Sequence, residues 1–389
     1  MAKQENNHIV LKTIACILVL IISAVGGFFF GFTNSFVNKD ESNVTIGELS
    51  MHFMYLGNKD NGDSIYIKAG DTDILVDAGS TADSLDTIKT YVNQYCTDGI
   101  LEYVIVTHAD LDHIAAFAGT TKENTSLFDF YKCKTIIDFA KSDKKLTTDS
   151  GDKSKYALYI EKRDNEVEND GAVHYTALQC YKNLDGAQRE YELAPDMSIE
   201  FLYHDYYENS ASKTEGEENN YSVCFMLKHG DRNFLFTGDL EEEGEASLVA
   251  KNTLPEVELY KAGHHGSKTS SNDVLLDVIK PKISVVCCSA GNVQYLTSGV
   301  QNLHNTFPTQ AYIDRISKHT EQVYVTTYAE IEMVDGRWKN TGEHGLLNGN
   351  IVVTSKALGV TVNCSNNNTL LKDTQWFKDN RDMPAAWNH

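Results

Sequence analysis

Basic residues, prolines and closely spaced cysteines are the scarce features of this 389-residue sequence. Its 34 Lys and Arg residues stand against 55 Asp and Glu residues, which gives a formal net charge of −21. That balance argues against sequence-independent binding of nucleic acid, because neutralisation of phosphates supplies most of the affinity of such binding. Only 5 prolines accompany 26 glycines, and 41% of the residues are apolar, so collagen, low-complexity tracts and global disorder are excluded.

The cysteines form neither a metal motif nor a disulfide framework. Eight are present without a C-x-x-C spacing, and the sequence has no internal repeat. Cys287 and Cys288 are adjacent in the apolar stretch 283–288, and we interpret them as two wall positions of a buried strand. The sequence therefore offers no cysteine-based metal site.

The N-terminal region reads as a membrane segment. Residues 13–32 carry no charge, and as a helix this run would span roughly 30 Å, the thickness of one hydrocarbon core. Lys12 precedes the run and Asp40 follows it, so the positive-inside rule places the rest of the chain outside the cytoplasm. The small residues at 23–27 form a weak cleavage site, which makes a secreted protein the alternative. We expect a cytoplasmic N-terminus at 1–12, a transmembrane anchor at 13–32 and a tether at 33–50.

The remainder of the chain predicts an α/β domain with two sheets. Short β-rich runs separated by turn residues indicate an antiparallel meander, followed by a helix at 81–95 and a buried strand at 103–106. Residues 120–190 are polar and suggest a surface lid. Pro281 ends a predicted helix at 272–279. The other predicted strands are 51–56, 64–68, 73–76, 198–203, 221–227, 233–236, 257–262, 283–288, 350–355 and 360–364.

Potential metal ligands follow three of these strands. His108, Asp110, Asp112 and His113 lie within six residues after the strand that ends at Val106. A solvated loop with a helix-capping Asp would explain that stretch alone. Two further strands also end in ligand-type residues, however, and together the three suggest one sheet edge lined with metal ligands. The later residues are Asp239, His264 and His265.

These motifs resemble the metallo-β-lactamase superfamily, in particular the branch of the ComEC/Rec2 competence proteins and the bacterial surface phosphorylcholine esterases. The matching stretches are Gly62-Asp63-Ser64, Leu75-Val76-Asp77-Ala78-Gly79, His108-x-Asp110-x-Asp112-His113, Thr237-Gly238-Asp239 and His264-His265-Gly266-Ser267-Lys268. The resemblance covers about residues 51 to 330. It implies an αββα sandwich, which we place at 51–345, with a small C-terminal β appendage at 346–389.

The resemblance also implies two divalent metal ions and a ligand for each motif position. His108 and Asp110 would bind one ion, Asp112 and His113 the other, and Asp239 would bridge both. We favour His265 as a ligand and His264 as the contact to the substrate, although the opposite assignment stays open. The usual third His of the first site is absent, and Asn220 is the substitute candidate. Asp77 would orient the ligands from behind, and Ser267 and Lys268 could hold an anionic substrate.

These departures affect the expected chemistry. With Asp110 in place of a second His, the three aspartates would carry −3 against +4 for two divalent ions. Zinc is the first choice, and the oxygen-rich first site also suits Mn²⁺ or Fe²⁺. A metal-bound water of lowered pKa would supply the nucleophile, and a pair of ions clamps the attacking and leaving oxygens, as phosphoester hydrolysis requires. Asp112 and His264 are the candidate catalytic residues.

Two function classes remain in competition, a metal-dependent hydrolase and a degenerate relative that binds without catalysis. Within the first class we expect an extracytoplasmic phosphodiesterase or phosphoesterase that acts on cell-envelope or small-molecule substrates. A competence-type nuclease is second, because the chain is acidic and lacks a multispanning channel, and a β-lactamase is third, because Asp110 and Asn220 depart from the usual ligand set. We expect the acidic run 241–245 to be the exposed start of a helix. The histidines to which we assign no role are His52, His174, His204, His229, His304 and His344.

Overall fold

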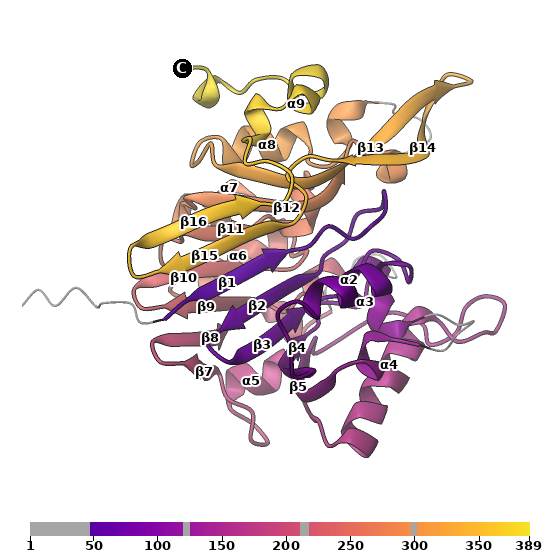
Figure 1. Cartoon of the computed structure of the whole chain (residues 1–389), viewed down its shortest axis with the longest axis vertical. Helices are drawn as coiled ribbons and strands as arrows, with labels where there is room; N and C mark the ends of the chain where they lie inside the picture. Colours follow the sequence, from indigo (N-terminus) through magenta and orange to yellow (C-terminus); the bar gives the residue numbers. More distant parts are fainter. Residues whose placement is uncertain (1–46, 120–124, 211–217, 297–301) are drawn as a thin grey trace, which may run out of the picture. The chain divides into compact units, whose positions relative to one another are not determined.

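A computed structural model describes residues 47–119, 125–210, 218–296 and 302–389 of the chain (Figure 1). Residues 45–389 form one compact unit. The predicted membrane segment 13–32, with the N-terminus before it, lies outside the described residues. Within the ranges that are described, no helix combines the length and the apolar character needed to cross a bilayer.

The first sheet begins with the predicted antiparallel meander. Strands β1, β2 and β3 pair antiparallel, and β3, β4, β5 and β6 then pair in parallel. Helices α2 (Ser84–Val92) and α3 (Leu111–Ala118) follow β3 and β4, as the apolar spacing of 81–95 indicated for α2. Along the described chain this sheet has the order β16-β15-β1-β2-β3-β4-β5-β6. Its strands are Leu49–Phe53, Ile65–Ala69, Thr72–Val76, Ile100–Ile105, Lys132–Asp138, Val173–Thr176, Ile351–Lys356 and Gly359–Cys364, from β1 to β6 and then β15 and β16.

The second sheet repeats this arrangement. Strands β7 to β10 pair antiparallel, and β10, β11, β12 and β13 pair in parallel. In the described part of the chain its order is β14-β13-β12-β11-β10-β9-β8-β7. The strands β7 to β14 are Glu190–Ala194, Met197–Phe201, Phe225–His229, Arg232–Phe236, Leu259–Lys261, Ile283–Ala290, Val323–Val334 and Arg337–Leu346. The helices α4 to α9 are Lys155–Asn165, Ala177–Lys182, Glu242–Lys251, Asp273–Ile279, Gln310–Ile316 and Gln375–Asn380.

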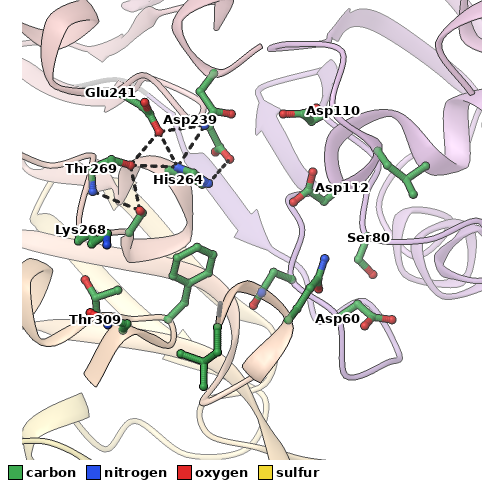
Figure 2. A pocket seen from close by; sticks show the side chains of 18 of the residues that line it. Asp60, Ser80, Asp110, Asp112, Asp239, Glu241, His264, Lys268, Thr269 and Thr309 are labelled. Atoms are coloured by element: carbon green, nitrogen blue, oxygen red, sulfur yellow. Dashed lines mark hydrogen bonds and ion pairs between the residues drawn. The ribbon is translucent and has the colours of Figure 1, made fainter. Parts of the chain in front are cut away.

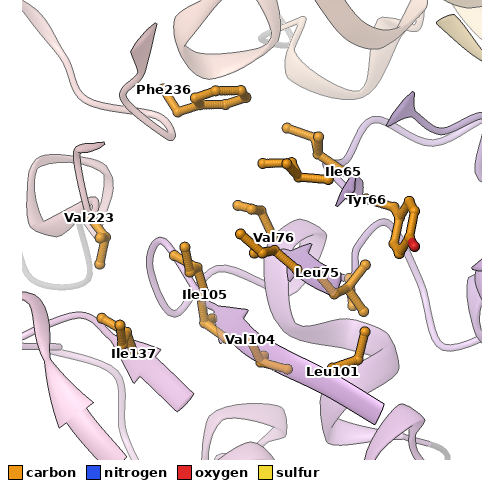
Figure 3. Close-up of a cluster of buried hydrophobic side chains, with 14 of the residues drawn as sticks. Ile65, Tyr66, Leu75, Val76, Leu101, Val104, Ile105, Ile137, Val223 and Phe236 are labelled. Carbon is orange, nitrogen blue, oxygen red and sulfur yellow. The ribbon is translucent and has the colours of Figure 1, made fainter. Parts of the chain in front are cut away.

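The two sheets pack face to face because their strands alternate between two apolar sides. Phe236 belongs to the core between the sheets and stacks on Phe53 of β1, with ring centroids 6.2 Å apart. Figure 3 shows Val76 and Ile105 on the side of the first sheet that faces Phe236. The neighbouring Leu235 points the other way, into a second cluster that also contains apolar residues of α6, α7 and α8. Helices, two sheets and helices therefore form the predicted four-layer sandwich.

Two polar regions differ from their predicted roles. The stretch 120–190, expected as a surface lid, supplies β5 and β6 of the first sheet, and α4 packs against α3. The strands expected in the C-terminal appendage extend the same sheet, since β15 pairs with β1. Their register places Leu49 opposite Ser355 and Phe53 opposite Ile351. Local polarity did not reveal either result, because the pairing of these strands joins residues far apart in the sequence.

Candidate metal centre

The chain segments that follow β4, β10 and β11 meet at one place between the two sheets. His113 Nε2 lies 3.2 Å from Asp239 Oδ2, and His265 Nε2 lies 3.3 Å from the same oxygen. His265 Nε2 also lies 3.3 Å from Asp112 Oδ2. Residues far apart in the sequence thus surround the Asp239 carboxylate, as the strand-end motifs suggested.

The loop after β4 is shaped by close backbone contacts. Asp110 is the N-cap of α3, and Asp112 stands in the first turn, where an acidic side chain is favourable. Gly79 passes so near this turn that an added Cβ would lie 1.4 Å from the Asp112 carbonyl oxygen. The backbone of Ala78 donates to His113 O and accepts from Ala116 N. The Asp77-Ala78-Gly79 stretch therefore supports the ligand loop directly.

The three buried histidines present the same ring nitrogen to the centre. His113 Nδ1 lies 2.8 Å from Asp77 Oδ2, and His265 Nδ1 lies 2.9 Å from the Cys287 carbonyl oxygen. His108 Nδ1 lies 3.1 Å from Thr107 Oγ1, whose hydrogen is donated to Asp77. Each Nδ1 therefore carries the ring hydrogen, and each Nε2 faces inward.

These inward atoms fit a divalent cation. His108 Nε2, His113 Nε2, His265 Nε2 and Asp239 Oδ1 are all buried without a hydrogen-bond partner. Such atoms are costly to bury, and imidazole nitrogen and carboxylate oxygen are common ligands of zinc and related metals. The triads His108–His113–Asp239 and Asp112–His113–His265 each bring their ligand atoms within 4.8 Å of one another. The donor set therefore suits divalent metal, and the two triads have His113 in common.

The pKa shifts of the ligand side chains also favour a bound cation. Burial opposes protonation of His113 and His265, yet the surrounding carboxylates, Asp239 first, raise the pKa of both rings, that of His265 to about 10. Burial also opposes ionisation of Asp239, but the three nearby histidines hold its pKa well below the usual range. The centre therefore favours positive charge, and a divalent ion would replace the protons on Nε2 of His113 and His265.

Asp63 and Lys261 lie behind the histidines, and sequence reasoning gave neither a role. The Lys261 ammonium is 1% exposed and lies 2.6 Å from Asp63 Oδ2. Asp63 Oδ1 lies 3.2 Å from His265 Nδ1, and Asp63 Oδ2 lies 4.0 Å from His113 Nδ1. A lysine inside the apolar stretch 257–262 was the available signal, because a buried lysine needs a charged partner.

Asn220, the predicted substitute ligand, contacts the backbone before α6. Its amide oxygen accepts the Glu241 backbone N–H at 3.0 Å and so supports the start of α6. The neighbouring Ser222 Oγ accepts the Asp239 backbone N–H at 3.0 Å and lies 3.5 Å from His108 Nδ1. This segment therefore positions Asp239 and His108, and the Asn220 oxygen is already engaged.

The two consecutive histidines after β11 diverge. Both have positive φ angles, 45° for His264 and 54° for His265, a strained conformation for residues other than glycine. His265 turns into the buried cluster, whereas His264 lines a pocket of about 760 Å³. His264 Nε2 lies 3.9 Å from Asp239 Oδ2, and its Nδ1 lies 3.4 Å from Glu241 Oε1.

One wall of the pocket comes from chain segments that follow strands of the first sheet, and the other from segments that follow strands of the second sheet. Figure 2 shows Asp110 and Asp112 on one side, and His264 with Glu241 on the other. Ser267 and Lys268 line the second wall, as the motif after the His pair suggested. The remaining labelled lining residues are Asp60, Ser80, Asp239, Thr269 and Thr309.

The acidic run after Asp239 is only partly the exposed helix start that we expected. Glu242 and Glu243 are exposed in the first turn of α6, but Glu245 is buried there. Glu241 accepts hydrogen bonds from Asn219 and Thr269 beside His264. In the described ranges, none of the six histidines left without a role belongs to a cluster able to hold a metal.

Comparison with known proteins agrees with the motifs. Residues 57–123 and 205–290 match the family described as the metallo-β-lactamase superfamily. ComE operon protein 3 of Bacillus subtilis (strain 168) is 26% identical over 194 residues, which cover 49% of this chain and 20% of that protein. Competence protein ComA of Neisseria gonorrhoeae is 37% identical over 90 residues, 22% of this chain and 13% of ComA. The chain thus spans only a minor part of these curated relatives.

One solved structure is a third point of comparison. The metallo-β-lactamase fold protein YhfI of Bacillus subtilis aligns with 71% of this chain and 95% of its own, at 11% identity and a TM-score of 0.39.

Proposed function

From the premise that this chain contains a metallo-β-lactamase superfamily domain, we propose that it is a dimetal-dependent phosphodiesterase. The observation that carries this proposal is the convergence of four buried ligand atoms without partners, His108 Nε2, His113 Nε2, His265 Nε2 and Asp239 Oδ1. These atoms support a bound cation, because each costs free energy when it is buried without a partner.

The side chains divide into two ligand sets that share Asp239. His108 and Asp110 would hold one ion, with Asp110 Oδ2 3.5 Å from His108 Nε2. Asp112 and His265 would hold the other, and His113 lies near both sets. Zinc is our first choice, since imidazole and carboxylate suit it, and Mn²⁺ or Fe²⁺ would also fit the carboxylate-rich set.

Bound divalent ions would polarise a phosphoryl oxygen and lower the pKa of water to near neutrality. The protein contributes orientation and proton transfer. Asp77 and the Cys287 carbonyl hold the Nδ1 hydrogens of His113 and His265, which fixes their ring planes. Glu241 Oε1 lies beside His264 Nδ1 and would hold the opposite nitrogen toward the pocket. His264 Nε2 is placed to donate a proton to the leaving oxygen.

The pocket favours a small anionic diester. Lys268 on its wall is suited to bind a phosphoryl oxygen as a point charge. The chain as a whole carries −21, which opposes the approach of a long polyanion unless salt screens it. Small or zwitterionic phosphodiesters, such as those of the cell envelope, avoid that repulsion.

A nuclease is the second candidate, and the resemblance to competence proteins favours it. The stretch that matches ComE operon protein 3 covers 49% of this chain. A dimetal centre that cleaves small diesters has the chemistry to cleave nucleic acid as well. Substrate choice would then depend on the charge and width of the approach to the pocket.

A substrate panel separates these candidates. We expect metal-dependent turnover of bis(p-nitrophenyl) phosphate or a phosphocholine ester by the purified chain, abolished in Asp112→Ala and His265→Ala. His264→Ala should lose rate while it retains its metal ions. Faster degradation of single- or double-stranded DNA at low salt than of any small diester would favour the nuclease, and absence of all turnover in the metal-loaded chain would favour a binding role.

We propose that residues 13–32 anchor the domain in the cell membrane with the pocket outside the cytoplasm. The length and lack of charge of that run support this placement. Protease added to intact cells should then digest a C-terminal tag. Protection of the tag until lysis would place the domain on the cytoplasmic side.

A further inference from the structure

Lys144 contacts the carboxylate of Asp110, although the sequence analysis assigned it no role. Its Nζ lies 2.5 Å from Asp110 Oδ1, and the other oxygen of that carboxylate, Oδ2, lies 3.5 Å from His108 Nε2. The two oxygens of Asp110 therefore face different partners. Oδ1 contacts the Lys144 ammonium, and Oδ2 points toward the ligand cluster.

The position of Lys144 is built into the fold. The backbone N–H of the preceding Asp143 donates to Glu218 Oε1 at 2.7 Å, and Tyr221 donates to Asp143 Oδ2 at 2.7 Å. Glu218 and Tyr221 are each 1% exposed, and they belong to the segment that also carries Ser222. A buried segment beside the centre thus fixes the loop that carries Lys144.

The ion pair between Lys144 and Asp110 changes the net charge of the metal centre. The described lining of the pocket includes five carboxylates and one lysine, Lys268. Lys144 is not among these lining residues, so it acts on the pocket through Asp110. Asp239, Asp112 and Asp110 would place −3 against two divalent ions, and the Lys144 ammonium offsets one of those charges. The carboxylates that line the pocket are Asp60, Asp110, Asp112, Asp239 and Glu241.

We propose that Lys144 is a positioning residue that determines the charge of the centre. It holds Asp110 by Oδ1, leaves Oδ2 for the metal, and offsets the charge that Asp110 brings to a ligand position where imidazole is neutral. The centre then remains electropositive enough to bind an anionic phosphoester. This inference rests on the proposed phosphodiesterase function.

Removal of Lys144 should change metal affinity and substrate affinity in opposite directions, which distinguishes this role from that of an ordinary ion pair. Removal of the ammonium leaves Asp110 with its full charge, so the metal ions should bind more tightly. The same removal makes the centre less positive, so an anionic substrate should bind less tightly. A merely structural contact would weaken metal and substrate binding together, and an exposed pair without a role would change neither.

The test compares Lys144→Gln with Lys144→Arg and with Lys153→Gln in the full chain. Lys153 belongs to the same region and also lies 2.5 Å from a carboxylate, Glu161, but that pair is exposed and neither residue is among those that line the pocket. The readouts are the metal dissociation constant, from competition with a chelator, and KM and kcat for bis(p-nitrophenyl) phosphate across a salt series.

We expect Lys144→Gln to bind metal about three- to tenfold more tightly and to raise KM about three- to tenfold at low salt. The rise in KM should shrink in 1 M salt, where the Debye length falls to about 3 Å. Lys144→Arg and Lys153→Gln should match the wild-type chain in both constants.

Two results would overturn the inference. One is a loss of metal affinity and substrate affinity together in Lys144→Gln, and the other is no change in either constant. A wild-type chain that binds two ions but hydrolyses no diester would instead contradict the proposed function. In that case the metal dissociation constants would still support or overturn the role of Lys144, because they do not depend on turnover.

Discussion

The two sheet regions supply the centre in different ways. The first region contributes His108 and Asp110 from the loop between β4 and α3, and Asp112 and His113 from the first turn of α3. The second contributes Asp239 after β10, and His264 and His265 after β11, which parallel pairing of Phe234 with Leu259 brings side by side. The first set is recognisable from its spacing in the sequence. The second set comes together only because β10 pairs with β11.

The regions also differ in how they stabilise the ligands. In the first, Asp77 accepts the Thr107 backbone N–H at 2.8 Å and its hydroxyl at 2.7 Å, and it lies 2.8 Å from His113 Nδ1. Behind the ligands of the second, Asp63 from the loop before β2 is paired with the buried Lys261 ammonium of β11. The second region therefore depends on a desolvated ion pair, and removal of one partner leaves the other charge exposed to an apolar interior.

The largest expected effect comes from Asp239, which we propose belongs to both ligand sets. Asp239→Ala should reduce metal content from about two ions to less than one and lower turnover by about a hundredfold or more, since even supporting residues of metal ligands contribute 10- to 100-fold. Asp110 belongs to only one ligand set, so Asp110→Ala should lose about one ion. Metal analysis of both variants checks this comparison, and two tightly held ions in Asp239→Ala would refute the shared ligand.

The buried ion pair gives the next largest effect. Lys261→Met or Asp63→Asn alone should reduce the free energy of unfolding by about 3–5 kcal/mol, because each leaves an unpaired polar or charged partner inside the protein. The double variant should recover most of that loss and still bind metal more weakly, since His265 loses its Asp63 contact. Denaturant unfolding and metal titration measure the two quantities. Equal stability of the double and single variants would contradict the coupling.

Each region also contains a buried histidine that should respond to acid. Burial lowers the pKa of His52, near β2 and α2, and of His204, beside Ser222, to about 4. The folded pKa lies below the value of about 6.5 in the unfolded chain, so stability is complete above that pH. It should fall by up to about 3 kcal/mol per histidine as the pH decreases from 6.5 toward 4.

Substitution of these histidines separates their contributions. His52→Gln and His204→Gln should each flatten the dependence of unfolding free energy on pH between 4 and 6.5, measured by denaturant titration. A variant with the wild-type slope would show that the corresponding ring is already protonated in the folded chain.

The smallest expected effect concerns Asn220. Because its oxygen accepts the Glu241 N–H at the start of α6, Asn220→Ala should cost about 1 kcal/mol of stability. Metal content should remain at the wild-type value. Loss of one ion in this variant would restore Asn220 as a ligand and change the division between the two sets.

Much of the fold was predictable because apolar alternation and turn residues mark the meander, the parallel strands and the helix at 273–279. The ligand cluster was predictable because its members follow strand ends. Asp63, Lys261 and Lys144 were not, since their contacts join residues far apart in the sequence. The use of Asn220 as a support of α6 was equally hidden, because an amide can serve as a ligand or as a backbone partner.

The most direct test of this account is the metal content of the purified full-length chain, measured together with hydrolysis of bis(p-nitrophenyl) phosphate before and after chelation. The shared Asp239 and the inward-facing histidines predict about two ions per chain, loss of turnover on their removal and recovery when zinc or manganese is restored. A chain that holds no divalent ion, or whose turnover survives chelation, would contradict it.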